Sequence, residues 1–225
     1  MAFTVHAVMP GVWHIVDCMG VCMTLLEGEN AAMLVDTGYG IENVADFMRH
    51  MTDLPLTVFL THNHHDHAMG ARCFPETYML EADMADWRMF TDDEMRRRVL
   101  TQAIGKNLPV DEKTFLAGEI PLPKVMKPGV IDLGGLTAEI IEAPGHTPGS
   151  AVVYVPERKL LLSGDDWNPC TWLFFPQALG LREYRSNMRG IQQLPFEKVL
   201  CPHREALYDR WMFDDFFNAL TDGNL

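Results

Sequence analysis

Short apolar runs separated by turn residues dominate the N-terminal part of the chain. Three such runs of strand length cover residues 12–16, 22–26 and 32–35. Gly20 and the glycine-containing segments 27–30 and 38–40 separate or follow them. This pattern predicts an antiparallel meander of three strands.

The pattern then alternates between helix and strand. Apolar residues recur at helical spacing over 41–51, and 56–60 is a continuous apolar run of strand length. After a charged, methionine-rich middle segment, the expected strands are 130–133, 138–141, 151–155, 160–162 and 199–200, with a hairpin turn at 156–159 and helices near 182–194 and 204–220. Two strand-rich halves, each closed by a strand and a helix, predict two sheets packed face to face with helices outside.

The middle segment, at about residues 80–109, stands apart from this alternation. Its apolar residues, such as Trp87 and Met95, have the spacing of short amphipathic helices. The sequence has no internal repeat and no stretch resembling an interdomain linker. We therefore predict a single domain over residues 1–225, with a helical insertion at about 80–109 that either packs on the sandwich or covers a substrate pocket.

The strongest chemical signal follows directly after the strand expected at 56–60. Six consecutive positions, 62–67, hold four histidines and one aspartate. A tight loop at the end of a strand can direct alternate side chains toward one point. His62 and His64 could then share one cation while Asp66 and His67 turn toward a neighbouring one, so the H-x-H-x-D-H spacing suits a site for two metal ions.

Further ligands are needed, because zinc takes three or four protein groups. Three candidates each follow an expected strand: His146 lies between two Pro/Gly turns, Asp165 follows 160–162, and His203 follows 199–200. Together with the 62–67 loop, these side chains complete two ligand sets.

These segments resemble the landmarks of the metallo-β-lactamase-fold hydrolase superfamily, in particular its glyoxalase II-like and lactonase-like members. The landmarks are Val35-Asp36-Thr37-Gly38, the 62–67 motif, Gly145-His146-Thr147-Pro148-Gly149, Ser163-Gly164-Asp165 and His203. The resemblance implies an α+β fold, a four-layer αββα sandwich of two mixed β-sheets flanked by helices, with metals at one edge.

The resemblance also implies a ligand set. It places His62, His64 and His146 on a first ion, Asp66, His67 and His203 on a second, and Asp165 between the two. Asp36 would order the loop without binding metal. The expected cofactors are two divalent ions, with Zn²⁺ as the default and Fe or Mn suited to the same donors.

The ligand set implies a reaction. Two ions about 3.5–4 Å apart can hold a bridging hydroxide at neutral pH, and Asp66 or Asp165 can orient it and pass a proton to the leaving group. The predicted function is metal-dependent hydrolysis of an ester-type bond in a thioester, lactone or related small ester. Alternatives are a persulfide dioxygenase-like oxygenase with a single iron, a β-lactam hydrolase, and a non-catalytic module that keeps the metals as structural clips.

The substrate pocket is expected to be apolar. Residues 167–175, next to Asp165, carry four aromatic side chains and no charge. Met69 stands where many family members have glycine. The predicted lining is Met69, Trp87, Trp167, Trp172 and Phe174, with packing beneath the loop as the alternative role of the aromatic rings.

Charge and composition limit the partners. The 225 residues include 18 Lys and Arg against 31 Asp and Glu, a net charge of −13. Nucleic acid is disfavoured as a partner, because that affinity needs clustered basic residues. No apolar run approaches the length of about 20 residues that a membrane span requires, and the sequence shows no signal-peptide pattern. The five cysteines have neither the spacing of a disulfide framework nor that of a zinc ribbon. We expect a cytoplasmic protein with buried free thiols and a small-molecule substrate; the oligomeric state stays open.

Overall fold

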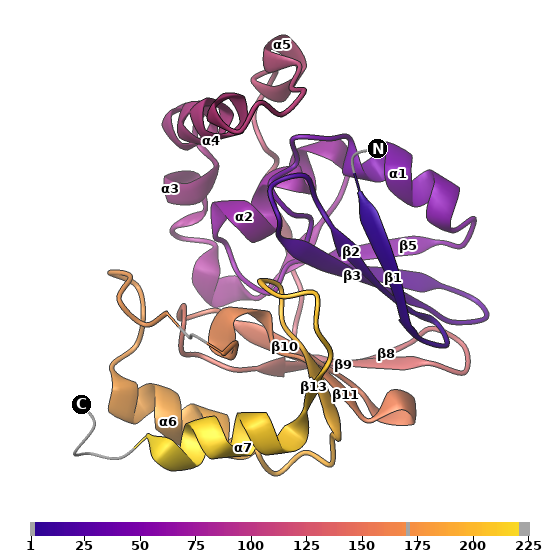
Figure 1. Cartoon of the computed structure of the whole chain (residues 1–225), viewed down its shortest axis with the longest axis vertical. Helices are drawn as coiled ribbons and strands as arrows, with labels where there is room; N and C mark the ends of the chain where they lie inside the picture. The colour runs from indigo at the N-terminus through magenta and orange to yellow at the C-terminus, as the bar shows by residue number, and fades with distance from the viewer. Residues whose placement is uncertain (1–2, 170–171, 221–225) are drawn as a thin grey trace.

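The computed structural model describes residues 3–169 and 172–220 and arranges their strands in two mixed sheets (Figure 1). The first sheet has the strand order β1 (Thr4–Met9), β2 (Val12–Val16), β3 (Cys22–Glu27), β4 (Ala32–Val35), β5 (Leu56–Phe59), β6 (Tyr78–Met79) and β7 (Lys124–Val125). The second has the order β13 (Tyr208–Asp209), β12 (Lys198–Leu200), β11 (Leu160–Leu162), β10 (Ala151–Val155), β9 (Thr137–Glu142) and β8 (Gly129–Asp132).

Each sheet combines antiparallel and parallel pairs. β2, β3 and β4 form the predicted antiparallel meander, and β5 then pairs parallel with β4. In the second sheet, β9, β10 and β11 are antiparallel, and β12 is parallel to β11. The predicted turn at 156–159 joins β10 to β11 through the 3₁₀ turn η3 (Pro156–Arg158).

The core between the sheets follows from the alternation of side chains along the strands. In β10, Ala151, Val153 and Val155 face the cluster between the sheets, whereas Val152 and Tyr154 face the helices outside. All five residues are buried. A central strand of this fold therefore has two apolar faces, which explains why β10 contains no charged residue.

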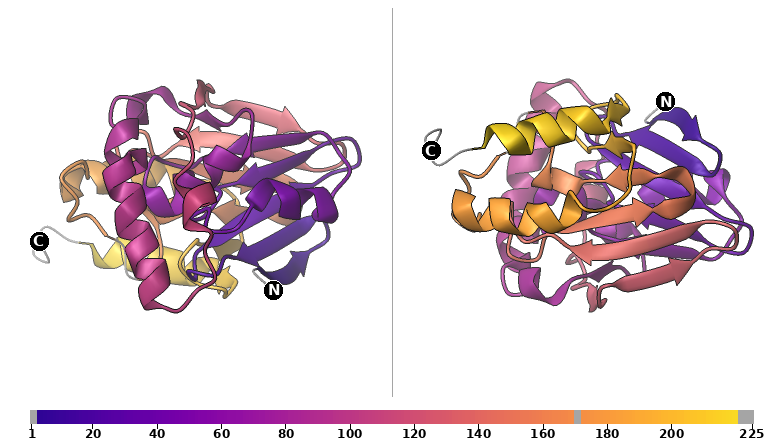
Figure 2. Two further views of the ribbon diagram at one scale, coloured as in Figure 1. Left: turned by 90° about the horizontal axis from the view of Figure 1, so that it is seen from above. Right: turned by 90° about the horizontal axis from the view of Figure 1, so that it is seen from below.

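Helices cover both outer faces. α1 (Val44–Met51) packs Val44, Ala45 and Met48 against the outer face of the first sheet. α6 (Leu181–Ile191) and α7 (Arg210–Ala219) lie over the second sheet, as the right-hand view of Figure 2 shows. The resulting four layers confirm the predicted αββα sandwich.

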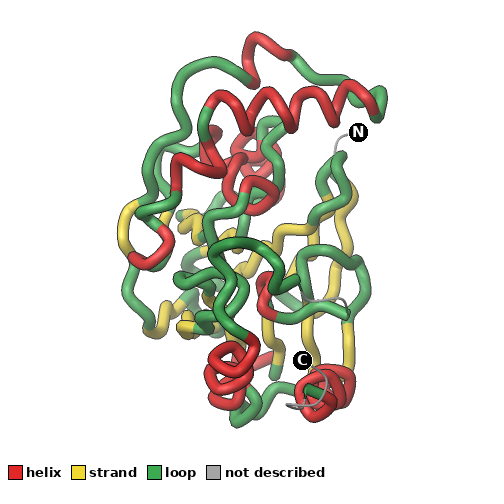
Figure 3. Tube along the Cα trace, turned by 90° about the vertical axis from the view of Figure 1, so that its left-hand side faces the viewer, coloured by secondary structure: helices red, strands yellow, loops and turns green. Residues whose placement is uncertain are grey.

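The middle segment forms a separate group of helices beside the sandwich (Figure 1, Figure 3). It contains η2 (Glu81–Asp83), α3 (Trp87–Thr91), α4 (Asp93–Gly105) and α5 (Glu112–Phe115). Buried Arg96 of α4 donates hydrogen bonds to the carbonyls of Phe115 and Gly118, which ties α4 to the segment that follows it. These helices pack with α2 (His65–Ala68) and η1 (Met69–Cys73), which continue the chain from β5.

Some element boundaries differ from the sequence-based prediction. The helix expected near 204–220 begins only at Arg210, because Tyr208 and Asp209 pair with β12 as β13. The helix expected at 41–51 begins at Val44, where the side chain of Asn43 caps it by accepting a hydrogen bond from Asp46 N. The edge strand β1 and the two-residue strands β6 and β7 were not predicted.

Cys18, Cys22, Cys73 and Cys201 are free thiols, as predicted, although only Cys22 and Cys201 are fully buried; Cys170 lies outside the described residues. Within residues 3–169 and 172–220, no helix combines the length and apolar character that a membrane span requires.

Candidate metal centre

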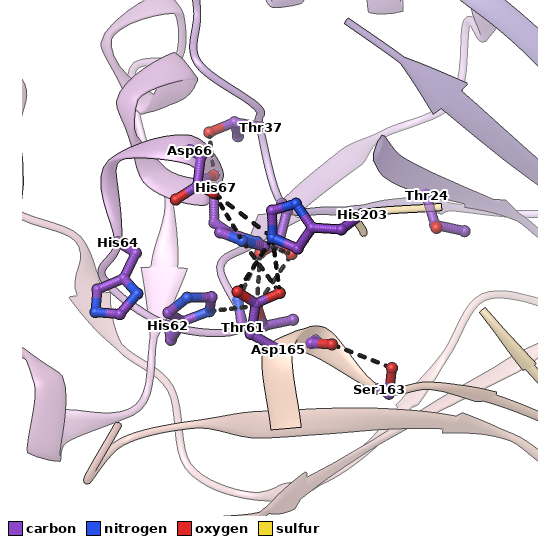
Figure 4. A network of polar contacts seen from close by, with 12 residues as sticks. Thr24, Thr37, Thr61, His62, His64, Asp66, His67, Ser163, Asp165 and His203 are labelled. Atoms are coloured by element: carbon purple, nitrogen blue, oxygen red, sulfur yellow. Dashed lines mark hydrogen bonds and ion pairs between the residues drawn. The ribbon is translucent and has the colours of Figure 1, made fainter. Parts of the chain in front are cut away.

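Seven predicted ligands converge at one edge of the sandwich, each from a segment that follows a strand. His62 and His64 lie between β5 and α2, Asp66 and His67 in α2, His146 after β9, Asp165 in η4 (Gly164–Asp166) after β11, and His203 after β12. Figure 4 shows His62, His67 and His203 around the carboxylate of Asp165. Residues separated by up to 141 positions (62 to 203) thus meet at one place.

The candidate ligand atoms form two clusters, and the carboxylate of Asp165 lies close to both. We call His62, His64 and His146 the first cluster and Asp66, His67 and His203 the second cluster; within each, the ligand atoms lie within 4.8 Å of one another. A third group, His62, His67 and Asp165, joins them under the same limit. Asp165 Oδ2 lies 3.5 Å from His146 Nε2, and Asp165 Oδ1 lies 3.5 Å from His67 Nε2, so this carboxylate lies between the clusters.

Hydrogen bonds on the far side of the rings aim their Nε2 atoms into the site. His146 Nδ1 lies 2.7 Å from the carbonyl oxygen of Trp172, and His67 Nδ1 lies 2.9 Å from Asp36 Oδ2. Both partners only accept hydrogen bonds, so we assign the proton to Nδ1 in each ring. Nε2 of each ring is then directed into the site as a potential metal ligand.

His62 is oriented in the same way. Its Nδ1 lies 3.0 Å from Thr61 Oγ1, whose own proton goes to the Asp36 carboxylate. The hydroxyl therefore accepts from His62 Nδ1, which leaves a lone pair on His62 Nε2. That buried atom has no hydrogen-bond partner among the described residues, an arrangement that is costly unless a ligand is bound.

These observations fit a divalent cation. Imidazole and carboxylate are the donors that Zn, Fe and Mn accept, and none of the ligand groups among the described residues contains cysteine. The donor set, its convergence and the unpartnered His62 Nε2 fit a bound divalent cation, and the assignment of each residue to an ion stays a prediction.

Burial and neighbouring imidazoles keep His62 and His64 uncharged. Burial first, and then His67, His64 and His146, hold the pKa of His62 well below its usual range. Burial and the neighbouring His146 lower the pKa of His64 to about 3. Neutral imidazole is the form that binds metal, so these two ligands need no deprotonation at neutral pH.

The second cluster has the opposite electrostatics. Burial alone would lower the pKa of His67, but the carboxylates of Asp165, Asp66 and Asp36 outweigh it and hold that pKa well above the usual range. Burial would raise the pKa of Asp165, but His67 and His203 outweigh it and hold that pKa well below the usual range. Without metal, a proton on His67 offsets the charge of the carboxylates, and a cation would replace it.

Asp36 orders the loop, as the resemblance implies. Its backbone has φ +65°, a left-handed conformation that is uncommon outside glycine. Its carboxylate accepts hydrogen bonds from Thr61 N at 2.7 Å, from the Thr61 hydroxyl and from His67 Nδ1. One side chain at the end of β4 therefore fixes both the start of the 62–67 loop and one ligand of the second cluster.

Asp83 of η2 has a related role that the sequence did not reveal. It accepts hydrogen bonds from the Thr147 hydroxyl at 2.7 Å, Gly149 N at 2.6 Å and Asn63 N at 3.2 Å. The side chain is buried and connects the turn that holds His146 to the loop that holds His62 and His64. Nothing in the local sequence around Asp83 indicates this contact.

The two clusters differ in accessibility. The side chains of the first cluster are almost completely buried, whereas the side chains of Asp66 and His203 are 13% and 11% exposed. The second cluster is therefore the more solvent-accessible of the two.

Three of the predicted pocket residues need correction. Met69, Trp87 and Trp167 have 0 to 1% exposure, so none of these side chains is accessible to a substrate in this structure. Met69 and Trp87 belong to the core of the helical group, and Trp167 packs against Tyr208 and Phe213 in the core below the second sheet. The alternative role, in packing beneath the loop, therefore applies to Trp167.

Trp172 and Phe174 lie nearer the surface. The Trp172 ring packs on His203 with a centroid distance of 4.7 Å, and Phe174 is 75% exposed and stacks on Phe175. Phe90 and Phe175 have rings 4.4 and 4.8 Å from the His64 ring. Aromatic side chains thus surround the candidate ligands.

Comparison of the sequence with known proteins points to the same family as the motifs. The family model described as metallo-beta-lactamase superfamily matches residues 16–203. Acyl-coenzyme A thioesterase MBLAC2 of Gallus gallus is 26% identical over 200 residues, which cover 80% of this chain and 70% of that protein.

Solved structures share the fold. The metallo-beta-lactamase FIM-1 of Pseudomonas aeruginosa in its mono-zinc form has a TM-score of 0.68 at 17% identity, covering 95% of this chain and 92% of that one. TTHA1623 in a di-iron-bound form has a TM-score of 0.60 at 22% identity, covering 86% and 92%. At these identities the structures support the fold alone; the family model, which spans most of the sequence, shows that the chain belongs to the metallo-beta-lactamase superfamily.

Proposed function

We propose that the chain is a binuclear metal-dependent hydrolase that cleaves an ester-type bond in a small molecule, with thioesters as the first class to test. The observation that carries this proposal is the position of Asp165 between two ligand clusters, each with three further donors. A single structural ion would need only one of these clusters.

The two clusters would hold two ions, with Zn²⁺ as the default and Fe or Mn as alternatives. When bound, such ions polarise a carbonyl and lower the pKa of a coordinated water toward neutrality. The mixed nitrogen and oxygen donors suit all three metals, so the choice among them is open to measurement.

The chain's own residues supply positioning and proton transfer. Asp66 is the carboxylate of the centre that keeps some exposure, which makes it the candidate to accept a proton from a water on the open side and deliver it to a leaving group. Asp165 is more deeply buried and paired with His67 and His203, which suits it to orientation. Phe90 and Phe175 limit water around His64.

The similarity to an acyl-coenzyme A thioesterase supports the ester class, and the acidic chain suits a small-molecule substrate better than nucleic acid. The intact set of seven candidate ligands also argues against a purely structural module.

The test combines elemental analysis of the purified protein with a hydrolysis screen over thioesters, lactones, phosphoesters and β-lactams. The expected result is about two ions per chain and ester or thioester cleavage that His64→Ala and Asp66→Ala abolish. One iron per chain with thiol-dependent oxygen uptake would instead identify a persulfide dioxygenase-like oxygenase. Cleavage of β-lactams alone would identify a β-lactam hydrolase. Bound metal without turnover on any substrate would contradict the proposal.

A further inference from the structure

A cavity of about 370 Å³ lies beside the first cluster, between the helices of the middle segment and residues 175–177. Its apolar wall consists of Met89 and Phe90 of α3, Met95 of α4, Phe175 and Pro176. Gln177 Nε2 contacts Met89 Sδ at 3.0 Å, so the two walls meet at one point. The helical insertion and the aromatic loop therefore form this cavity jointly.

The cavity adjoins the candidate metal centre. Phe90 and Phe175 line it, and both rings also contact the ring of His64. Phe175 lies 5.4 Å from His146 as well, measured between ring centroids. A group that enters the cavity thus lies one aromatic ring away from two ligands of the first cluster.

The charged residues of the lining do not favour an anion. Arg98 donates to Glu94, one turn earlier on α4, and this contact offsets its charge. Asp92 caps α4 by accepting a hydrogen bond from Met95 N. The lining therefore contributes two carboxylates against one guanidinium, in a chain of net charge −13. A phosphate or carboxylate would meet repulsion here, whereas a hydrocarbon chain would meet thioethers and aromatic rings.

We propose that this cavity binds the acyl chain of the substrate, so that the preferred substrates are esters or thioesters of acyl groups several carbons long, with any anionic part of the leaving group outside it. The proposal rests on the proposed function, because the scissile carbonyl must lie at the metal centre for the chain to enter here.

The first experiment measures binding without turnover. S-ethyl and S-octyl N-acetylcysteamine, two uncleavable thioethers, are titrated into the metal-loaded protein by calorimetry. Each methylene removed from water is worth about a factor of four in affinity, so the octyl compound should bind at least about 100-fold more tightly than the ethyl compound. Met95→Trp narrows the cavity and Met89→Glu places a charge in its wall; each should reduce this ratio to below about 10-fold.

Ile104→Trp is the matched control, because Ile104 lies on the same helix, is 54% exposed and does not line the cavity. It should keep the wild-type ratio. Met89 is also 54% exposed, so Met89→Glu remains informative if Met95→Trp does not fold. Equal affinity for the two thioethers in the wild type, or an unchanged ratio in both cavity variants, would overturn the proposal.

Hydrolysis of the acetyl and octanoyl thioesters, measured in parallel, separates this proposal from the proposed function. Tight octyl binding that the cavity variants weaken, without turnover on these thioesters or on any ester of the screen, would overturn the hydrolase and leave only a cavity that binds hydrocarbon chains. Cleavage of both at equal kcat/KM, with equal binding of the two thioethers, would overturn the cavity and leave the hydrolase in place.

Discussion

The Thr147 hydroxyl donates to Asp83 Oδ2 at 2.7 Å, although the two residues are 64 positions apart. Thr147 directly follows His146, and Asp83 also accepts from the backbone of the loop between His62 and His64. A carboxylate of the helical insertion thereby fixes the relative position of two loops that carry the first cluster.

Replacing Asp83 should therefore impair the metal centre. In Asp83→Asn the amide group would face the N–H of Asn63 or Gly149, so one hydrogen bond becomes a donor–donor contact. We expect kcat/KM to fall by about 10-fold or more in Asp83→Asn and by about 100-fold in Asp83→Ala, because small displacements of positioned groups have effects of this size. Asp86→Asn is the control, because the Asp86 side chain makes no capping hydrogen bond. Unchanged kcat/KM and metal affinity in Asp83→Ala would contradict this role.

Gly149 should tolerate no side chain. A Cβ at this position would lie 2.6 Å from both the backbone nitrogen and the Cγ of Asp83. Gly149→Ala must push η2 away from the His146 turn, which should lower the free energy of unfolding by about 1–3 kcal/mol. Denaturant unfolding measures this value. Gly180→Ala, where an added Cβ has no neighbour within 4 Å among the described residues, is the control and should cost much less.

Metal binding should release protons. Asp165, Asp66 and Asp36 outweigh burial and raise the pKa of His67, so the metal-free protein carries a proton there that a cation must displace. Affinity should then rise about tenfold per pH unit below that pKa, with about one proton released per ion in the second cluster. Calorimetry in buffers of different ionisation enthalpy measures the number. A pH-independent affinity would show that His67 binds no proton in the metal-free state.

The second cluster should lose its ion first. Its ligands Asp66 and His203 are partly exposed, whereas the first cluster is almost completely buried. Limited treatment with a chelator should give an intermediate with about one ion per chain, and His203→Ala should bind about one ion as purified. His146→Ala removes a buried ligand instead. If both variants retain the same full metal content, the two-cluster assignment fails.

Asp166 should reduce stability at neutral pH. Burial raises its pKa well above the usual range, so the folded chain holds a proton that the unfolded chain has lost above pH about 4. The free energy of unfolding that this group contributes therefore falls as the pH rises from about 4 toward the raised pKa of Asp166 in the folded chain. Asp166→Asn keeps an acceptor for His146 N and should be more stable than wild type at pH 7, with a difference that shrinks toward pH 4. Asp53→Asn, at an exposed position, is the control, and thermal unfolding of both variants at pH 4 and pH 7 measures the difference.

The sequence could predict which candidate ligands converge and where most strands lie, because these signals are local. Four histidines and an aspartate occupy five of the six positions 62–67. The buried strands β4, β10 and β11 are continuous apolar runs with the predicted boundaries. β6 and β13 have two residues each and exist only because a neighbouring strand pairs with them, so no local pattern marks them.

The pocket was predicted less well, because the accessibility of a side chain depends on tertiary contacts that no local pattern marks. Trp167 and Trp172 are alike in sequence context, yet one is buried in the core and the other packs on His203. Which of two neighbouring aromatic rings faces a site depends on tertiary contacts. The role of Asp83 likewise depends on contacts with residues far along the chain.

Each cluster combines side chains from segments that follow strands of both sheets: His62 and His64 join His146, and Asp66 and His67 join His203. A bound cation would therefore act as a cross-link between the two halves of the sandwich at their open edge. Separation of the sheets would require ligand bonds to break, so the N-terminal and C-terminal halves should unfold together in the metal-loaded protein and less cooperatively once the ions are removed.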